Sequence, residues 1–369
     1  MDAALTYETV AFGDLSDEDR AQWLSLRAGD PALESPYHHP DYHAMVDDHQ
    51  GGVKVTLARQ DGEIVALLPW QGRVFARPSG APLSDYQAVI AKQCADIDAA
   101  SLLSGQKIGA FHYAAMPRKD GRDTARLEIA SSKDWRDARD GSYRRHLKST
   151  RRRIRKTEDE IGAPCTVFQS RNIDAYRTLI RWKRDKFDET GKFDVLGNPG
   201  TSGLLRALWE RGPEAGLRAD LHVLYFGDRI AACDLGLTDG RVFHSWIIGY
   251  DPDLQAYAPG IQLLERLIDA APDIGYRVID LGPETDGYKR HYATHPRRVG
   301  AGVIALPRPS GRLATGYDRM EDALREHTHD ALGKLRRRYS QIAACEPHPA
   351  ARSRALAIAI ARHFGGRSA

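Results

Sequence analysis

The feature that most constrains the fold of this chain is a hairpin pattern that occurs twice. Val53–Trp70 reads "VKVTLARQDGEIVALLPW", and Leu221–Leu237 reads "LHVLYFGDRIAACDLGL". In each stretch two apolar or alternating runs surround a tight polar turn, Asp61-Gly62 in the first and Gly227-Asp228 in the second, as is typical of a β-hairpin. The repetition predicts an internal duplication. Because hairpins with such turns are common, chance similarity is the alternative interpretation.

The residues around the second hairpin alternate between strand and helix patterns. Apolar residues at helical spacing follow Pro259-Gly260, so a helix is expected to begin there. The expected elements, in chain order, are helices near Ile173–Phe187 and Ser202–Arg211, the hairpin, a strand at Arg241–Tyr250, the helix from Pro259, a strand in "YRVIDLG", a short helix or turn, and a strand at Arg297–Leu306. This order predicts an α/β (α+β) fold with helices flanking a mixed central sheet.

The first half of the chain has a looser version of the same order. A helix is expected from Pro40, followed by the hairpin, a strand near Arg73–Arg77, a helix at Ile97–Leu103 and a strand in "IGAFHYAAM". The sequence therefore predicts two related units, residues 1–141 and 163–306, joined by a basic connecting helix at residues 142–162. Residues 307–369 are expected to form a basic helical tail.

The predicted connecting helix is strongly cationic. Eight Lys and Arg residues and no acid lie between Tyr143 and Lys156, while Leu147, Ile154 and Ile161 recur every seven residues. This pattern predicts one narrow apolar ridge on an otherwise basic helix. Three interpretations stay open: a solvated connector, a surface for an anionic acceptor such as a sugar phosphate, and a surface that lies against an anionic membrane. Contact with a cyclic dinucleotide is a further alternative.

Composition and missing motifs exclude several classes of protein. The four cysteines form no Cys-x-x-Cys pair, which disfavours a zinc ribbon or a disulfide scaffold and fits a reducing compartment. The N-terminus lacks the apolar core of a signal peptide, and no stretch has the roughly 20 apolar residues that span a bilayer. We therefore expect a cytoplasmic protein, with a peripheral position at the inner membrane as an alternative.

No catalytic or nucleic-acid-binding signature of the common kinds is present. Gly-x-Ser-x-Gly, P-loop and His-Glu-x-x-His motifs are missing, and so are the motifs of sequence-specific nucleic-acid binding. The stretch "YHHPDYH" (Tyr37–His43) gathers possible metal ligands, but a helix that begins at Pro40 explains it as well. We expect no bound metal.

The strand in "YRVIDLG" is followed at once by a turn that carries acid, phenol and ammonium groups. In open α/β sheets, ligands bind beyond the carboxyl ends of strands, where Asp280 is expected to lie. Acyl transfer by direct attack needs a base for the proton of the nucleophile and an acid for the departing thiolate. We therefore expect Asp280 or Glu284 to act as base or substrate-orienting group, Tyr288 as acid or thioester-positioning group, and Lys289 as an anion contact. The alternative is a capped turn followed by a solvated amphipathic helix.

Four stretches, in this order, carry a resemblance to a known family. They are "LKSTRRRIRKTEDEIG", "GDRIAACDLGL", "APGIQLLERLIDAA" and "IDLGPETDGYKRHYA". Together they resemble the GNAT-type acyltransferase domain of CelD-like proteins, which are associated with cellulose and other exopolysaccharide biosynthesis and are related to the FemAB aminoacyl transferases. "SPYHHPDYH" and "GAPLSDYQAVIA" look like parts of the first half of the same proteins. The resemblance covers about Ser35 to Leu306 and implies tandem GNAT-like domains.

The resemblance also implies where an acyl-CoA would bind. The family's phosphate-binding loop corresponds to "QAYAPGIQ", which departs from the family pattern because it has one glycine and a proline. A helix N-terminus still offers N–H groups to a phosphate, but proline has none to donate. Acetyl-CoA or another acyl-CoA is the expected co-substrate, with a carrier protein or an aminoacyl-tRNA as alternatives. The expected cofactor-binding residues are Tyr250, Tyr257, Gly260, Ile261 and Gln262.

The remaining candidates are expected to bind the acceptor. Asp85 and Tyr86 lie in a short polar stretch that is flanked by apolar residues. Asp234 lies in an otherwise apolar predicted strand, and its carboxylate needs a partner if it is buried. Ser245 and Trp246 lie on an adjacent predicted strand. The expected function is transfer of an acetyl or similar acyl group to an amine or hydroxyl of a sugar-containing exopolysaccharide precursor, or of its sugar phosphate. The alternatives are a FemAB-like aminoacyl transferase and a non-catalytic binding or regulatory module.

Overall fold

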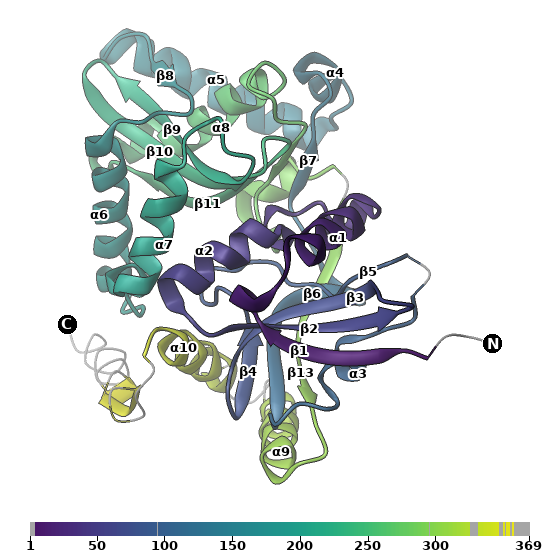
Figure 1. The fold of residues 1–369 in the computed structure, drawn as a ribbon. Helices are drawn as coiled ribbons and strands as arrows, with labels where there is room; N and C mark the ends of the chain where they lie inside the picture. The colour runs from purple at the N-terminus through teal and green to yellow at the C-terminus, as the bar shows by residue number, and fades with distance from the viewer. Residues whose placement is uncertain are drawn as a thin grey trace. The chain divides into compact units, whose positions relative to one another are not determined.

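The computed structural model describes residues 4–93, 95–294, 296–324, 331–346, 350, 352–354 and 356–357. The chain packs into two compact units (Figure 1). Unit 1 comprises Met1–Arg118, Phe187–Leu204 and Gly300–Ala369, and unit 2 comprises Lys119–Lys186 and Leu205–Val299. Each unit therefore takes segments from separate parts of the sequence.

Unit 1 is built on a seven-stranded sheet with the order β1-β2-β3-β4-β6-β13, and β5 pairs with β3. Its strands are β1 (Thr6–Ala11), β2 (Val53–Gln60), β3 (Glu63–Gly72), β4 (Phe75–Pro78), β5 (Ile90–Ala91), β6 (Ala110–Asp123) and β13 (Arg298–Ala305). Its helices include α1 (Asp17–Ala28), α2 (Pro40–Gln50), α3 (Ala99–Leu103), α9 (Pro309–Leu324) and α10 (Ala331–Cys345). β6 and β13 each have residues in both units.

Unit 2 is built on a six-stranded sheet with the order β7-β12-β11-β10-β9-β8. Its strands are β7 (Arg126–Glu128), β8 (Cys165–Val167), β9 (Arg218–Phe226), β10 (Arg229–Thr238), β11 (Val242–Tyr250) and β12 (Val278–Asp280). The helices of this region are α4 (Ser132–Asp137), α5 (Gly141–Glu160), α6 (Ile173–Glu189), α7 (Pro199–Glu210) and α8 (Pro259–Ala270), with the 3-10 helices η5 (Pro252–Tyr257) and η6 (Gly287–His291).

The two sheets have the same strand order and direction. The runs β1-β2-β3-β4 and β8-β9-β10-β11 are antiparallel throughout. The next neighbours, β4 with β6 and β11 with β12, are parallel. The predicted hairpins are β2–β3 and β9–β10, and they occupy equivalent places in the two sheets. The predicted mixed α/β fold with two related units is therefore confirmed.

One strand in each sheet comes from an unexpected part of the sequence. The strand expected at Arg297–Leu306 is β13, and it pairs with β6 in the sheet of unit 1. β7, which lies before the basic helix and was not expected, pairs with β12 in unit 2. The backbone changes partner between β6 and β7, because Thr124 N donates to Arg297 O (2.8 Å) and Ala125 N donates to Gly282 O (2.9 Å). This long-range pairing has no local sequence signal.

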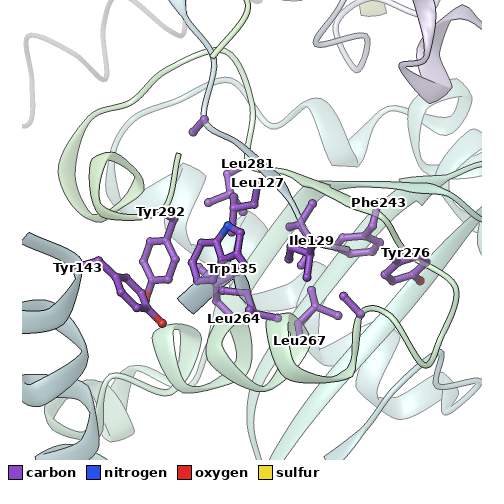
Figure 2. Packing of buried hydrophobic residues seen from close by; sticks show 14 residues of the cluster. Leu127, Ile129, Trp135, Tyr143, Phe243, Leu264, Leu267, Tyr276, Leu281 and Tyr292 are labelled. Carbon is purple, nitrogen blue, oxygen red and sulfur yellow. The ribbon is translucent and has the colours of Figure 1, made fainter. Parts of the chain in front are cut away.

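A buried cluster of unit 2 packs α8 against the sheet (Figure 2). Leu264 and Leu267 of α8 lie next to Trp135 and Ile129, and all four side chains are at most 5% exposed. The predicted helical spacing of apolar residues after Pro259 therefore does place one face of α8 in the core. Replacing Leu264 or Leu267 with alanine in such a core costs about 2–5 kcal/mol of stability.

The basic helix α5 buries a stripe next to the predicted ridge, of which Leu147 is partly buried against the core cluster. Tyr143, Thr150 and Thr157 are at most 1% exposed, whereas Ile161 is 39% exposed. The Thr150 and Thr157 hydroxyls donate to carbonyls one turn earlier in α5, and Thr157 Oγ1 also accepts a hydrogen bond from the Gln262 amide of α8. Two of the three buried residues are threonines. Their seven-residue spacing was therefore less evident in the sequence than the apolar spacing of Leu147 and Ile154.

Candidate functional site

The two central parallel strands of unit 2 separate soon after they meet. β11 and β12 pair only at Val242–Val278, Phe243–Ile279 and His244–Asp280. β11 continues to Tyr250, where it still pairs with β10. Within the part of the chain that the structure describes, no strand pairs with the far half of β11 on its β12 side. This divergence at the carboxyl ends of two parallel strands is a common location for ligands in α/β proteins.

The divergent half of β11 begins with an irregularity in its pairing to β10. Gly236 lies opposite Ser245 and Leu235 lies opposite Ile247, so the register skips Trp246. Such a bulge re-aims the neighbouring side chains. Here Ser245 Oγ donates to Asp234, at 2.9 and 2.8 Å from the two carboxylate oxygens. The buried carboxylate anticipated from the sequence therefore has a hydroxyl partner on the adjacent strand.

The environment of Asp234 favours its protonated form. The residue is 2% exposed, and burial raises the pKa of its carboxyl group to about 7. The hydrogen bond from Ser245 and the charges of His244 and Lys183 oppose that rise in pKa but do not cancel it. Lys183, on α6, donates from Nζ to the Ile248 carbonyl at 3.3 Å. A carboxyl group that titrates near neutral pH is suited to general base catalysis.

Tyr288 lies on η6, half-buried against the core cluster of unit 2. Its ring makes an edge contact with Tyr292 at 6.2 Å between centroids. Burial and the charge of Asp234 raise the pKa of the Tyr288 phenol to about 12. The phenol therefore stays protonated at neutral pH and can donate a hydrogen bond.

Asp280 ends β12 as predicted, but its surroundings include groups that sequence reasoning missed. Its carboxylate accepts from Gly282 N at 2.8 Å and lies 3.6 Å from His244 Nδ1. It is 6% exposed, and Arg126 of β7 is its register partner on the other side. His244 is fully buried. It could have been found from the sequence, because it is a polar residue next to Ser245 in the otherwise apolar strand "VFHSWIIGY".

The other residues of the predicted acidic turn are more peripheral. Glu284 is exposed and forms an ion pair with the exposed Arg122 at 2.8 Å. Lys289 donates from Nζ to the Leu281 carbonyl at 2.6 Å, which ties η6 to the end of β12. The catalytic role expected for Glu284 and the anion contact expected for Lys289 stay predictions.

The start of α8 is the predicted phosphate site, and it lies against the divergent end of β11. A Cβ atom added at Gly260 would lie 3.8 Å from Tyr250 Cδ1 and 3.9 Å from Ile248 Cδ1. Ala258, the residue before α8, has the left-handed backbone angles φ 52° and ψ 55°. The N–H groups of Ile261 and Gln262 both donate to its carbonyl, at 3.1 and 3.2 Å.

The side chains expected to hold a cofactor have mixed surroundings. Gln262 is fully buried, and its amide donates to Thr157 Oγ1 (2.9 Å) and to the Tyr257 carbonyl (3.0 Å). The Tyr257 hydroxyl donates to Glu160 at 2.6 Å. Tyr250 is 42% exposed at the end of β11. Of these residues, Tyr250 and Gly260 therefore lie beside the end of β11 that has no partner strand on its β12 side.

Asp85 and Tyr86 lie in unit 1, in the segment between β4 and β5. Tyr86 is 8% exposed and makes an edge contact with Tyr37 at 6.3 Å between centroids. Tyr37 has its pKa raised by burial and by the charge of Asp85. These residues form a local tyrosine cluster of unit 1, and their acceptor-binding role stays a prediction.

Neither a metal-binding cluster nor a membrane-spanning helix is present among the described residues. No group of three or more His, Cys, Asp or Glu residues in that part of the chain is arranged to hold a metal ion. No helix among the same residues combines the length and the apolar character that a membrane crossing requires.

Comparison with known proteins identifies the region that carries this site. Residues 144–290 match the family model described as "Acetyltransferase (GNAT) domain". This match spans α5 to η6 and so includes Asp234, Ser245, Asp280 and Tyr288. No curated protein matches the chain.

Solved structures with a similar fold cover most of the chain. A crystal structure of FemX has a TM-score of 0.51 and 10% identity, over 83% of this chain and 99% of that one. A tandem GNAT protein from the clavulanic acid biosynthesis pathway has a TM-score of 0.44 and 11% identity, over 82% and 98%. The C-terminal domain (DUF2156) of a putative lysylphosphatidylglycerol synthetase from Agrobacterium fabrum has a TM-score of 0.45 and 11% identity, over 84% and 96%. The likeness to FemX shows a shared fold.

Proposed function

We propose that the chain moves an acyl group from acyl-CoA to an amine or hydroxyl, because residues 144–290 match the family model of an acetyltransferase (GNAT) domain. The observation that carries the proposal is the divergence of β11 from β12, with a carboxyl group whose pKa is about 7 on the adjacent strand β10 and a phenol on η6 that stays protonated at neutral pH. The carboxylate can act as the base of direct acyl transfer, and the phenol can donate a hydrogen bond to the leaving group.

Asp234 is the group best suited to take the proton of the nucleophile. It is buried, so the proton reaches it through the half-buried Ser245 hydroxyl, which already donates to both of its oxygens. Ser245 Oγ accepts the proton of the attacking amine or hydroxyl as its own proton passes to the carboxylate. The nucleophile then forms a bond to the thioester carbonyl carbon. This assignment gives Asp234 the base role first expected for Asp280 or Glu284.

Tyr288 is the candidate donor to the leaving group. When the carbon–sulfur bond breaks, the electron pair stays on sulfur, and a thiolate with an ordinary pKa of about 8.5 is released. A phenol with a pKa of about 12 remains protonated at neutral pH and stabilises the sulfur by donating a hydrogen bond. The thiolate then takes a proton from solvent as it leaves.

The start of α8 is the expected position for the pyrophosphate of the thioester donor. A helix N-terminus attracts anions through its N–H groups and its dipole. Gly260 lets the backbone come close, and the exposed ring of Tyr250 lies beside it. The acceptor is proposed to be a sugar-containing precursor of an exopolysaccharide, or its sugar phosphate. The family resemblance supports this acceptor.

The test is a direct measurement of thioester binding and turnover. Isothermal calorimetry with acetyl-CoA is expected to show binding, and release of free CoA thiol is expected to accelerate with an amino sugar or a sugar phosphate. An exposed carboxylate on the β9–β10 turn supplies the control variant, Asp228→Asn. Asp234→Asn should bind acetyl-CoA like the native protein and release thiol far more slowly. Equal thiol release by the two variants would show that Asp234 is not the base.

One observation favours a second candidate, an aminoacyl transferase of the FemAB type. Pro259 has no N–H, and the next N–H groups of α8 after Gly260 are already bonded to Ala258 O. This leaves fewer donors for a pyrophosphate than an open helix start provides. Pro259→Ala restores one donor and should tighten acetyl-CoA binding several-fold if CoA is the donor. No binding of acetyl-CoA by either form, with transfer from an aminoacyl-tRNA, would favour the second candidate.

A further inference from the structure

The exposed side of α5 is a continuous cationic surface. Six of its exposed Lys and Arg side chains are together called the α5 cationic face: Arg144, Arg145, Lys148, Arg151, Arg152 and Arg155. At 3.6 residues per turn they lie within about 120° of the helix circumference and along about 17 Å of its length. Within the part of the chain that the structure describes, none of the six forms an ion pair.

The acids near α5 are confined to its two ends. Asp140 caps the N-terminus, where it accepts from Ser142 N (2.8 Å) and Tyr143 N (3.0 Å). Glu158, Asp159 and Glu160 follow the last cation, and Glu160 is the partner of Lys156 at 3.9 Å. The uncompensated charge therefore lies in the middle of the helix. Such a field attracts an anionic partner and weakens with added salt.

The opposite side of α5 is held firmly by unit 2. Tyr143 is buried and donates to Glu265 of α8 at 3.1 Å. Ser142 Oγ lies 2.7 Å from His291 Nδ1, and His146 stacks on His291 at 4.8 Å between ring centroids. The cationic side chains are consequently presented from a fixed backbone, which reduces the ordering cost when they meet a partner.

We propose that the α5 cationic face docks unit 2 on the surface of an anionic lipid bilayer. A flat array of negatively charged headgroups can be reached at once by long Lys and Arg side chains that lie on one side of a straight helix. Nucleic acid is the other polyanion to consider. The aromatic ring of Tyr143 is buried, and no Asn or Gln lies along α5, so the face has neither a stacking ring nor an amide to read bases.

This docking is independent of the proposed chemistry, because none of the six residues lies in the Asp234–Ser245–Tyr288 site. It would bring an enzyme without a membrane-spanning helix among its described residues to an acceptor borne by a lipid surface. The attraction is electrostatic and involves no apolar insertion, since the six side chains are all charged. Binding is therefore expected to be reversible and sensitive to ionic strength.

Vesicle co-sedimentation of the full chain tests the proposal. The probe is vesicles of phosphatidylcholine with 30% phosphatidylglycerol, compared with pure phosphatidylcholine, at low and at high salt. The triple variant Arg151→Gln, Arg152→Gln, Arg155→Gln should bind the anionic vesicles at least about tenfold more weakly, given roughly a tenfold effect for one or two such charges. The matched control is Arg177→Gln, Arg181→Gln, Arg184→Gln on α6, which removes the same charge and should bind like the native chain.

The outcomes distinguish membrane docking from misfolding of the variants and from nucleic-acid binding. Both triple variants must keep the native melting temperature and the native response to acetyl-CoA, so that loss of vesicle binding cannot reflect misfolding or a failed thioester site. No binding of the native chain to anionic vesicles would overturn the proposal, as would equal loss in both triple variants. Tight binding of duplex RNA without vesicle binding would assign the face to nucleic acid instead.

Discussion

Ser245 Oγ lies 2.9 and 2.8 Å from the two carboxylate oxygens of Asp234, so one hydroxyl bridges a carboxylate that is almost removed from solvent. The two residues are on adjacent strands and are brought together where the register skips Trp246. A buried carboxylate with a single neutral partner keeps a raised pKa, and the hydroxyl connects it to the surface. The predictions on catalysis and on pH dependence start from this pair.

The rate of acyl transfer should depend on the ionisation of Asp234. Since burial raises the pKa of Asp234 to about 7, only the fraction ionised above that pH can accept a proton, and kcat should rise through pH 7. Asp234→Asn should lower kcat by about 10²–10⁴-fold and abolish this dependence. A pH–rate profile of thiol release measures both effects. The same profile in the variant, at a uniformly lower rate, would point to another base.

The phenol of Tyr288 should matter for turnover and not for binding. Tyr288→Phe removes the hydrogen-bond donor but keeps the ring that packs on Tyr292. We expect kcat to fall by about 10–100-fold, the effect of losing one hydrogen bond to a charged group, while the Kd of acetyl-CoA is unchanged. Tyr7→Phe, at an exposed tyrosine of β1, is the matched control and should behave like the native chain. A weaker Kd with normal kcat would instead make Tyr288 a binding residue.

Asp234 should also limit stability at alkaline pH. Its folded-state pKa of about 7 exceeds its ordinary value of 3.8, so the folded chain holds this proton more tightly than the unfolded chain. Stability is therefore lost as pH rises between these values, and the loss is complete above pH 7. Asp234→Asn should stabilise the protein by about 4 kcal/mol at pH 8 and by about 2 kcal/mol at pH 5. Urea unfolding at the two pH values measures this difference, and an equal gain at both would contradict it.

The backbone of Ala258, the residue before α8, should be strained because it is in the left-handed conformation. Ala258 has φ 52°, a conformation that costs an L-residue with a Cβ atom about 1 kcal/mol. Ala258→Gly should therefore raise the free energy of unfolding by up to about 1 kcal/mol. Ala138→Gly, at φ −75°, is the control and should lower it, because that site gains nothing from glycine. Thermal unfolding of both variants checks the sign of each change.

Patterns that depend on neighbouring residues were readable from the sequence alone. The two hairpins, the helix that begins at Pro259 and the strand that ends at Asp280 follow from alternation, helical spacing and turn residues, and all three kinds of element form as predicted. The many Lys and Arg residues of α5 likewise predict a basic helix from the sequence alone. Local conformational preference and periodicity decide these features, so they need no knowledge of the rest of the chain.

The tertiary structure decided which of these elements meet and with what consequence. The pairing of β13 with β6 and of β7 with β12 joins residues far apart in sequence, and no periodicity encodes it. The bulge that joins Ser245 to Asp234, the fully buried His244 and the loss of pairing beyond His244–Asp280 also depend on strand register. Because a pKa is set by burial and by the charges that surround a group in space, Asp234 became a candidate base only once the chain was folded.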